Sequence, residues 1–320
     1  MSDRRVLEAR AHLMAGELVA IPTETVYGLA GNGFVAETVS KIFAVKNRPT
    51  FDPLILHTDS LSKIEAWIGE LSPLAHRLAV AFWPGPMTLV LPTSSLIPDL
   101  VTSGLPSVAF RIPAHPLTLE LLSLLPFPLA APSANPFGYI SPTRAEHVAN
   151  QLGGQVAYIL DGGPCAVGVE STIVSCVSDP PAVLRLGGLT LSRLQSVVKE
   201  VAVRPHSSSR PEAPGMLESH YAPCKPFFLG DLQFLLEQHQ DKGCAVLGFG
   251  DLSKIDTSSV VRLHNLSPSG SLAEAAQNLF AYMRLLDDCA AADCILAAPL
   301  PERGLGRAIN DRLRRAAGSK

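Results

Sequence analysis

The apolar positions of the first 200 residues follow two periods, one typical of helices and one typical of strands. Val6, Leu13 and Met14 lie on a helical period, and the apolar run 18–21 that follows is typical of a buried strand. Further strands are expected at 54–57, 87–91, 108–112, 129–131, 157–160, 172–176 and 183–186, with helices at 36–46, 60–69, 73–82, 115–125, 143–152 and near 190–200. This alternation predicts an α/β domain with a large central sheet at 1–203.

The pattern breaks at 204–224, a segment with four prolines, four serines and no apolar period. Because proline favours extended backbone and cannot continue a helix, we expect a linker there. A second alternation follows, with strands at 227–229, 245–247, 260–263 and 294–297 and helices at 231–240, 272–287 and 306–316. It predicts a smaller, open α/β sheet in a domain at 225–320.

The composition agrees with two packed domains. The chain has 320 residues, of which 47% are hydrophobic and 17% charged, and this excludes a mainly disordered protein. Its net charge of −3 argues against a protein whose main role is to hold a nucleic-acid backbone. A small local basic patch that binds tRNA or double-stranded RNA weakly is still compatible with this charge.

The lack of targeting patterns and the spacing of the cysteines indicate the cellular compartment. The sequence has no apolar run of about 18 residues, as a membrane span requires, and its first residues lack the pattern of a signal peptide. Six cysteines are scattered without a CxxC pair, which favours reduced thiols over disulfides or a zinc site. We therefore expect a cytoplasmic protein with no membrane contact.

Polar residues follow the first predicted strand in the sequence PTETVYGL at 22–29. Loops that leave the carboxyl ends of strands are where α/β sheets place ligands, and two hydroxyls, a carboxylate and a phenol can hold a small polar substrate. A polar turn that needs Gly28 for its backbone explains the same pattern. His57, at the end of a later strand, is either a core imidazole or a substrate contact.

Three cationic residues are candidates for binding an anionic substrate. Lys46 and Arg48 stand two residues apart before Pro49, so they can offer a point charge and a bidentate fork to one polyphosphate. The alternative is that they stabilise the end of a helix. Arg111 lies in an apolar strand, where it either faces solvent or meets an anion, and the alternation of the strand favours solvent slightly.

Several short stretches of small and hydroxylated residues are weaker signals. They are APSAN at 131–135, SPT at 141–143, GVEST at 168–172 and LRLGG at 184–188. Thr143 and Glu146 also have the spacing of a capping box. The sequence contains no GxxxxGK[ST] motif, no GxGxxG after a strand and no histidine spacing typical of a metal site.

In this order, the segments resemble the YrdC family of threonylcarbamoyl-AMP synthases in its long, two-domain form. The stretches that carry the resemblance are PTETVYGLAGNG, KNRPTFDPLILH, WPGPMTLVL, FRIPAHP, APSAN, ISPTRAEH, GVESTIV, LRLGG, APGM, HYAP and GLGRAINDRL. The resemblance implies a YrdC-like domain with a large twisted mixed sheet flanked by helices, and a smaller Rossmann-like α/β domain after it.

The family's reaction converts L-threonine, bicarbonate and ATP to threonylcarbamoyl-AMP and pyrophosphate. The product feeds the threonylcarbamoyladenosine modification of tRNA through a separate transferase complex, and Mg²⁺ is expected with the ATP, without an assigned protein ligand. By similarity, Lys46 and Arg48 are catalytic. The implied threonine contacts are Thr25, His57, Arg111, Ala131 and Ser171, and the implied ATP contacts are Arg48, Asp52, Ser107, Ser133, Ser141, Arg185 and Tyr221.

Some positions depart from the family pattern. Asp52 stands where the family usually has asparagine, and this places a negative charge near the expected phosphate site. Ser175, Leu186, Leu217 and Ser219 also differ. Two alternatives compete with the synthase: a non-catalytic RNA-binding protein of the same fold, and the carbamoyl-transfer domain of hydrogenase maturation proteins. The latter chains are much longer and carry zinc-type cysteine pairs.

Overall fold

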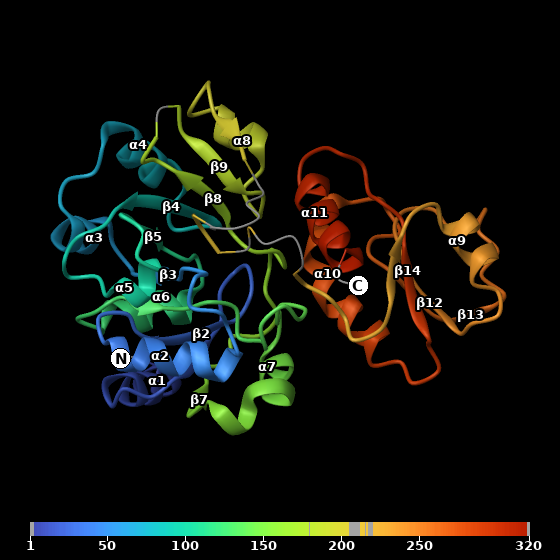
Figure 1. Cartoon of the computed structure of the whole chain (residues 1–320), viewed down its shortest axis with the longest axis horizontal. Helices are drawn as coiled ribbons and strands as arrows, with labels where there is room; N and C mark the ends of the chain where they lie inside the picture. The colour runs from blue at the N-terminus through green and yellow to red at the C-terminus, as the bar shows by residue number, and fades with distance from the viewer. Residues whose placement is uncertain (1–2, 179, 205–211, 215, 217–219, 319–320) are drawn as a thin grey trace. The chain divides into compact units, whose positions relative to one another are not determined.

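The computed structural model describes residues 3–178, 180–204, 212–214, 216 and 220–318. The chain divides into two compact units (Figure 1). The first comprises Met1–Phe137, Pro142–Ala166 and Glu170–Leu217, and the second comprises Gly138–Ser141, Val167–Val169 and Glu218–Lys320. Two short segments that precede residue 170 therefore belong to the second unit. The division predicted at 203 and 225 stays a prediction.

The first unit has a sheet of ten strands among its described residues. Its strands are β1 (Val19–Ile21), β2 (Gly28–Asn32), β3 (Ile55–His57), β4 (Met87–Pro92), β5 (Ser107–Arg111), β6 (Leu129–Ala130), β7 (Tyr158–Ile159), β8 (Thr172–Ser175), β9 (Ala182–Arg185) and β10 (Ala202–Val203). They are ordered β10-β9-β8-β4-β5-β3-β6-β2-β1-β7. The sheet is mixed, because it contains parallel pairs such as β3–β5 and antiparallel pairs such as β4–β5.

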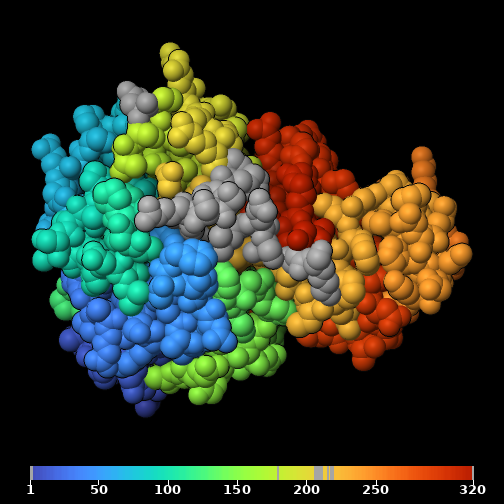
Figure 2. Space-filling model, viewed as in Figure 1, coloured from blue at the N-terminus to red at the C-terminus, as the bar shows by residue number. Residues whose placement is uncertain are grey.

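The helices of the first unit pack on both faces of this sheet. They are α1 (Arg4–Met14), α2 (Ala36–Lys46), α3 (Leu61–Ile68), α4 (Pro73–Phe82), α5 (Asp99–Thr102), α6 (Pro116–Ser123), α7 (Ala145–Leu152) and α8 (Leu191–Gln195), with a 3-10 turn at Gly153–Gln155. Apolar residues of α2, α3 and α4 share one core with Leu56, Leu89 and Phe110 of the central strands. Helices α1 and α6 form a second core with β1, β2 and β6. In the space-filling view, the blue segment that contains α1 and α2 is part of the outer surface (Figure 2).

Local chemistry fixes the helix ends that matter for the site. Helix α4 begins where Ser72 Oγ accepts the N–H of Ala75, with Pro73 at the first helical position. Helix α2 ends at Asn47, whose φ of 51° is left-handed. Asparagine tolerates that conformation better than most residues, so the chain turns sharply between Lys46 and Arg48.

The second unit contains a four-stranded parallel sheet in the order β11-β14-β12-β13. Its described elements are β11 (Phe227–Leu229), α9 (Leu232–Gln238), β12 (Cys244–Gly248), β13 (Val260–Asn265), α10 (Leu272–Asp287), β14 (Cys294–Ala297) and α11 (Gly306–Ala317). The expected fold class, a large mixed sheet with a smaller parallel α/β sheet, is confirmed. No described helix is long and apolar enough to cross a membrane.

Three details of the sequence analysis were wrong or incomplete. Strand β2 was missed, because its sequence GLAGN lacks the β-branched residues that signal a strand. The capping box at Thr143 does not form: α7 starts after Arg144, with no side-chain cap. The short elements α5 and β10 were also missed, since four and two residues give no usable period.

Candidate active site on one face of the large sheet

The register of the strands places predicted site residues on one face of the sheet. His57 in β3 lies opposite Arg111 in β5. Two residues earlier in β5, Ala109 lies opposite Val90 in β4. Two residues before Val90, Thr88 lies opposite Ile173 in β8, and Ile173 in turn lies opposite Arg185 in β9. Because side chains alternate along a strand, residues two apart share a face.

The face defined in this way carries five of the predicted residues. The strand pairs assign three of them to this face: Arg111, His57 and Arg185. The other two follow from the alternation of side chains along a strand, because Ser107 lies four residues before Arg111 and Ser171 lies two residues before Ile173. An apolar cluster occupies the middle of the same face. It consists of Ile55, Val90, Ala109, Ile173, Ala182 and Leu184, packed against Ala213 and Met216. Ala213 and Met216 therefore cover part of the site face.

The four predicted cations are all buried. Their exposed fractions are 1% for Lys46, 8% for Arg48, 4% for Arg111 and 6% for Arg185. Burial of charge is costly unless partners compensate it, so each cation must be held by specific contacts. All four belong to the first unit.

Arg185 is held by Ser171 and by the segment that covers the face. Its Nε donates to the Ser171 carbonyl at 3.1 Å, its Nη2 to the Ser171 hydroxyl at 3.0 Å and its Nη1 to the Pro214 carbonyl at 3.2 Å. The Ser171 hydroxyl also contacts Thr88 Oγ1 at 2.8 Å. Gly187 packs so tightly here that a Cβ would lie 2.2 Å from the Glu170 carbonyl.

Lys46 and Arg48 surround a buried carboxylate. Lys46 Nζ donates to the carbonyls of Ser133 and Asn135. Arg48 donates to the carbonyls of Asp52, at 3.1 Å, and Pro53, at 2.9 Å. Its Nη2 also forms an ion pair with Asp52 Oδ2 at 2.9 Å. Among the described residues, neither side-chain oxygen of Asp52 has a hydrogen-bond partner, so this contact lacks hydrogen-bond geometry.

The pKa shifts show that these charges act on one another. Burial lowers the pKa of Lys46 well below its ordinary value, with repulsion from Arg48 as the second cause. Burial raises the pKa of Asp52, while Arg48, Arg185 and Lys46 oppose that rise. The carboxylate of Asp52 therefore senses three of the four cations, which come from α2, the turn after it and β9.

The fourth cation, Arg111, pairs with a residue that the sequence analysis did not assign. Its Nη2 lies 2.7 Å from Glu24 Oε1, and its Nε donates to the Gly85 carbonyl at 3.3 Å. The slight preference for a solvent-exposed Arg111 was wrong, because the loop at 22–27 supplies a buried carboxylate. Burial and then Arg111 lower the pKa of His57 to about 3, so its ring is neutral near pH 7.

The loop at 22–27 is tied to the residues that follow β6. Thr25 is fully buried, and its hydroxyl contacts Thr23 Oγ1 at 2.8 Å. The Ala134 N–H donates to the Tyr27 carbonyl at 2.8 Å, and the next residue, Gly28, forms a β-bridge with Ser133. The Ala131 N–H donates to the carbonyl of Ile55 in β3 at 3.1 Å. Thr25, Ala131 and Ser133 are thus anchored in the same unit as the cations.

Two predicted ATP contacts belong to the second unit. Arg284 of α10 donates to the Ser141 carbonyl at 3.4 Å and to the Ile140 carbonyl. The ring of Tyr221 stacks on Phe280 at 5.4 Å, and the Arg312 guanidinium lies 5.4 Å from its centre. Within the second unit both residues are firmly packed, and their ATP contacts stay predictions.

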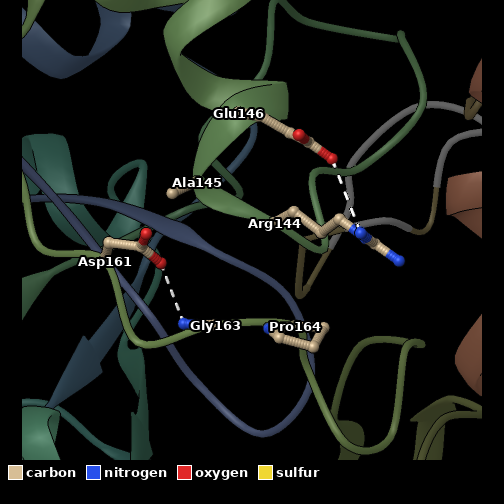
Figure 3. Close-up of a pocket in the computed structure, with 6 residues that line it drawn as sticks. All are labelled: Arg144, Ala145, Glu146, Asp161, Gly163 and Pro164. Atoms are coloured by element: carbon tan, nitrogen blue, oxygen red, sulfur yellow. Dashed lines mark hydrogen bonds and ion pairs between the residues drawn. The ribbon is translucent and has the colours of Figure 1, made fainter.

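A separate pocket of the first unit lacks the predicted residues. Its volume is about 200 Å³, and it is lined by Arg144, Ala145, Glu146, Asp161, Gly163 and Pro164 (Figure 3). Asp161 Oδ1 accepts the Gly163 N–H there at 2.9 Å. Because its ion pair between Arg144 and Glu146 is exposed, this pocket is a weaker candidate than the site face.

The described residues contain no group of three or more His, Cys, Asp or Glu side chains that could hold a metal ion. Glu24, Thr88 and Gly187 are the site residues that sequence reasoning missed. The sequence held a signal for Glu24, since this residue lies in the polar loop that follows the first strand. Thr88 gave no signal, because a threonine is ordinary in a strand.

A mixed α/β sheet with buried, compensated cations on or beside one face is suited to an enzyme that binds small anionic substrates. The crystal structure of Pyrococcus abyssi Sua5 complexed with L-threonine superposes with a TM-score of 0.92 and 38% identity, covering 98% of this chain and 94% of that one. The structure of a doubly substituted Sua5 from the same organism gives a TM-score of 0.91 at 38% identity, covering 98% of this chain and 93% of that one.

Sequence comparisons agree. A family model described as "Telomere recombination" matches residues 11–187, and one described as the C-terminal domain of threonylcarbamoyl-AMP synthase matches 189–318. Threonylcarbamoyl-AMP synthases of Pyrococcus abyssi and Bacillus subtilis are each 39% identical, over 99% and 100% of this chain and 95% and 94% of theirs. The chain belongs to the threonylcarbamoyl-AMP synthase family, which confirms the resemblance inferred from its motifs.

Proposed function

We propose, from the site and the family together, that this protein is a threonylcarbamoyl-AMP synthase. It converts L-threonine, bicarbonate and ATP to threonylcarbamoyl-AMP and pyrophosphate, for the modification of tRNA. The observation that carries the proposal is the set of four buried cations in the first unit, three of which act on the single carboxylate of Asp52. Polyanionic substrates would compensate this charge.

Arg111 is suited to the carboxylate of threonine. Its guanidinium is a planar fork that matches a carboxylate, and it lies opposite the neutral ring of His57. A neutral imidazole can accept or donate a hydrogen bond without adding charge. Thr25, Ala131 and Ser171 would supply the remaining contacts to the amino acid.

The chemical step is an in-line displacement. A carbamate oxygen forms a bond to the α-phosphorus of ATP, the bond from that phosphorus to the bridging oxygen breaks, and pyrophosphate leaves. Since all reacting groups are anionic, the protein must hold them together and neutralise charge. Lys46, Arg48 and Arg185 would take that role, and a deprotonated carbamate requires no general base.

Mg²⁺ would neutralise phosphate charge when bound with ATP. It commonly takes most of its ligands from phosphates and water, with one or two carboxylates from the protein. The described residues fit a nucleotide-borne ion, since they contain no group of three or more His, Cys, Asp or Glu side chains that could hold a metal, and the carboxylate of Asp52 already pairs with Arg48. We propose that the nucleotide carries the ion.

The direct test is to incubate the full-length protein with ATP, L-threonine and ¹³C-bicarbonate and to analyse the products by mass spectrometry. We expect an adenylate that carries the label, with pyrophosphate released in equal amount, and neither product without threonine. ATP consumption without the labelled adenylate would refute the synthase. RNA binding without any product would favour the non-catalytic alternative.

Transfer of the product is a further part of the proposal. A separate tRNA-modifying threonylcarbamoyl transferase complex would consume the adenylate in the cytoplasm, and weak direct binding of tRNA would accompany it. Addition of tRNA and such a complex to the reaction should move the ¹³C label into tRNA. Retention of all label in the adenylate would contradict this step.

A further inference from the structure

The ion pair between Glu24 and Arg111 joins two segments that are far apart in the sequence. Glu24 lies in the loop between β1 and β2, and Arg111 is the last residue of β5. Both side chains are nearly inaccessible, with exposed fractions of 10% and 5%. Glu24 Oε1 lies 2.7 Å from Arg111 Nη2, an oblique approach that is an ion pair and not an aligned hydrogen bond.

The other oxygen of Glu24 is also engaged. Glu24 Oε2 accepts the N–H of Ala114 at 3.0 Å, so one carboxylate contacts both the end of β5 and the turn after it. The loop is fixed independently two residues earlier, where the Thr118 hydroxyl donates to the Pro22 carbonyl. Glu24 therefore reaches Arg111 from a rigid support.

These contacts define the orientation of the guanidinium. Nε of Arg111 donates to the Gly85 carbonyl and Nη2 faces Glu24, so two of its three nitrogens are held by groups from different segments. Among the described residues, no hydrogen bond involves Nη1. A carboxylate bound in the fork of Nη1 and Nη2 would meet a guanidinium whose plane is already set.

We propose that Glu24 is a positioning residue, which orients Arg111 for the carboxylate of the amino-acid substrate. This inference rests on the proposed function. A buried arginine without this partner would retain its charge but adopt several rotamers, and the substrate would have to select one of them. Glu24 acts through Arg111 and not by contact with ATP, so its loss should weaken amino-acid binding selectively.

The test compares Glu24→Gln, Glu24→Asp and Glu37→Gln in the pyrophosphate-release assay. Glutamine keeps the size of the side chain but removes the charge that faces Arg111. The KM for threonine should rise about 10- to 100-fold, the range for one lost charge-assisted interaction, while kcat and the KM for ATP stay within about twofold. Aspartate keeps the charge and should recover part of the loss.

Glu37 provides the matched control. Its side chain is 82% exposed, and it pairs with Lys41 of the same helix at 3.6 Å, so Glu37→Gln should leave all constants unchanged. An unchanged or lower KM for threonine in Glu24→Gln would overturn the inference, as would an equal rise in the KM for ATP. If Glu24→Gln fails to fold, the same criteria apply to Glu24→Asp.

The wild-type protein separates this inference from the proposed function. Failure of the wild type to form the labelled adenylate refutes the function itself. An active wild type, together with a normal threonine KM in the Glu24 variants, refutes only the positioning role.

Discussion

Replacement of Asp52 by asparagine tests how the site balances its buried charge. Loss of one partner from a buried ion pair usually costs about 3–5 kcal/mol, because the remaining charge is uncompensated. At Asp52 a second effect opposes that cost. Burial raises the pKa of this carboxyl in spite of three cations, so its ionised form is itself unfavourable in the folded protein.

The two effects should nearly cancel. Arg48 keeps the Asp52 and Pro53 carbonyls as acceptors, and the asparagine side-chain oxygen can replace the lost carboxylate oxygen. We expect Asp52→Asn to change the free energy of unfolding by less than about 1 kcal/mol at pH 7. For a unit of this size that is a shift in Tm of about 2–4 °C.

Binding of ATP should improve in the same variant. A negative charge roughly 10 Å from a phosphate charge costs about 1.7 kcal/mol at an effective dielectric constant of 20. Since each 1.4 kcal/mol is a factor of ten, the Kd for a non-hydrolysable ATP analogue with an α,β-methylene bridge should fall about tenfold or more. Isothermal titration measures this Kd without interference from the chemical step.

The pH dependence of stability adds a sign that can be checked. The pKa of Asp52 in the folded protein lies above its ordinary value of 3.8. At a pH between these two pKa values, the native state therefore binds more protons than the unfolded state. Asp52 therefore makes stability fall as pH rises through that window, and Asp52→Asn should remove this decline.

A matched control is available in Asp59, which pairs with Lys63 at 2.7 Å in the same i,i+4 spacing but is 20% exposed. Asp59→Asn should cost less than about 1 kcal/mol and leave the analogue's Kd unchanged. The reasoning is wrong if Asp52→Asn lowers the Tm by about 10 °C, or if its affinity for the analogue is not increased.

Three other substitutions test separate parts of the site. Lys46→Ala should lower kcat for pyrophosphate release by about 100-fold or more. Lys41→Ala, at an exposed lysine of the same helix, is the control, and near-normal turnover of Lys46→Ala would contradict the phosphate role. His57→Gln should reduce the loss of stability on acidification. The folded pKa of about 3 lies below the ordinary 6.5, so the contribution of His57 to stability falls by about 1.4 kcal/mol per unit as pH drops through that window. Equal slopes of wild type and variant in denaturant titrations at pH 4–6 would refute this. Gly187→Ala should lower Tm and activity together, because its Cβ would meet the backbone of residues 170 and 171, whereas Gly154→Ala, with open space around it, should change neither.

Periodicity predicted the long helices well. The ranges 36–46, 73–82 and 272–287 were expected from the sequence, and α2, α4 and α10 have those bounds. Each carries at least ten residues, so its apolar stripe repeats often enough to be recognised. Strands of two to five residues were found to within one or two residues where they are apolar, and β2 was missed because it is rich in glycine.

The partners of the site residues could not be predicted in the same way. The period-2 pattern around Arg111 fits a strand with one solvated face, but the pairing of β5 with both β3 and β4 makes it a central strand. The carboxylate that compensates Arg111 lies far away in the sequence, at Glu24. A single sequence contains no local signal for such a contact, since only the folded sheet brings the two together.

The arrangement of charges suggests why the first unit tolerates four buried cations before any substrate is bound. Two of them meet carboxylates, at Glu24 and Asp52, and Lys46 is held by the carbonyl oxygens of Ser133 and Asn135. Dipoles stabilise a cation without cancelling its charge, so Lys46 keeps its attraction for phosphate. A second carboxylate beside Lys46 would make the unliganded protein more stable and ATP binding weaker. Burial and then Arg48 lower the pKa of Lys46, and the negative charge of a bound polyphosphate would oppose that shift.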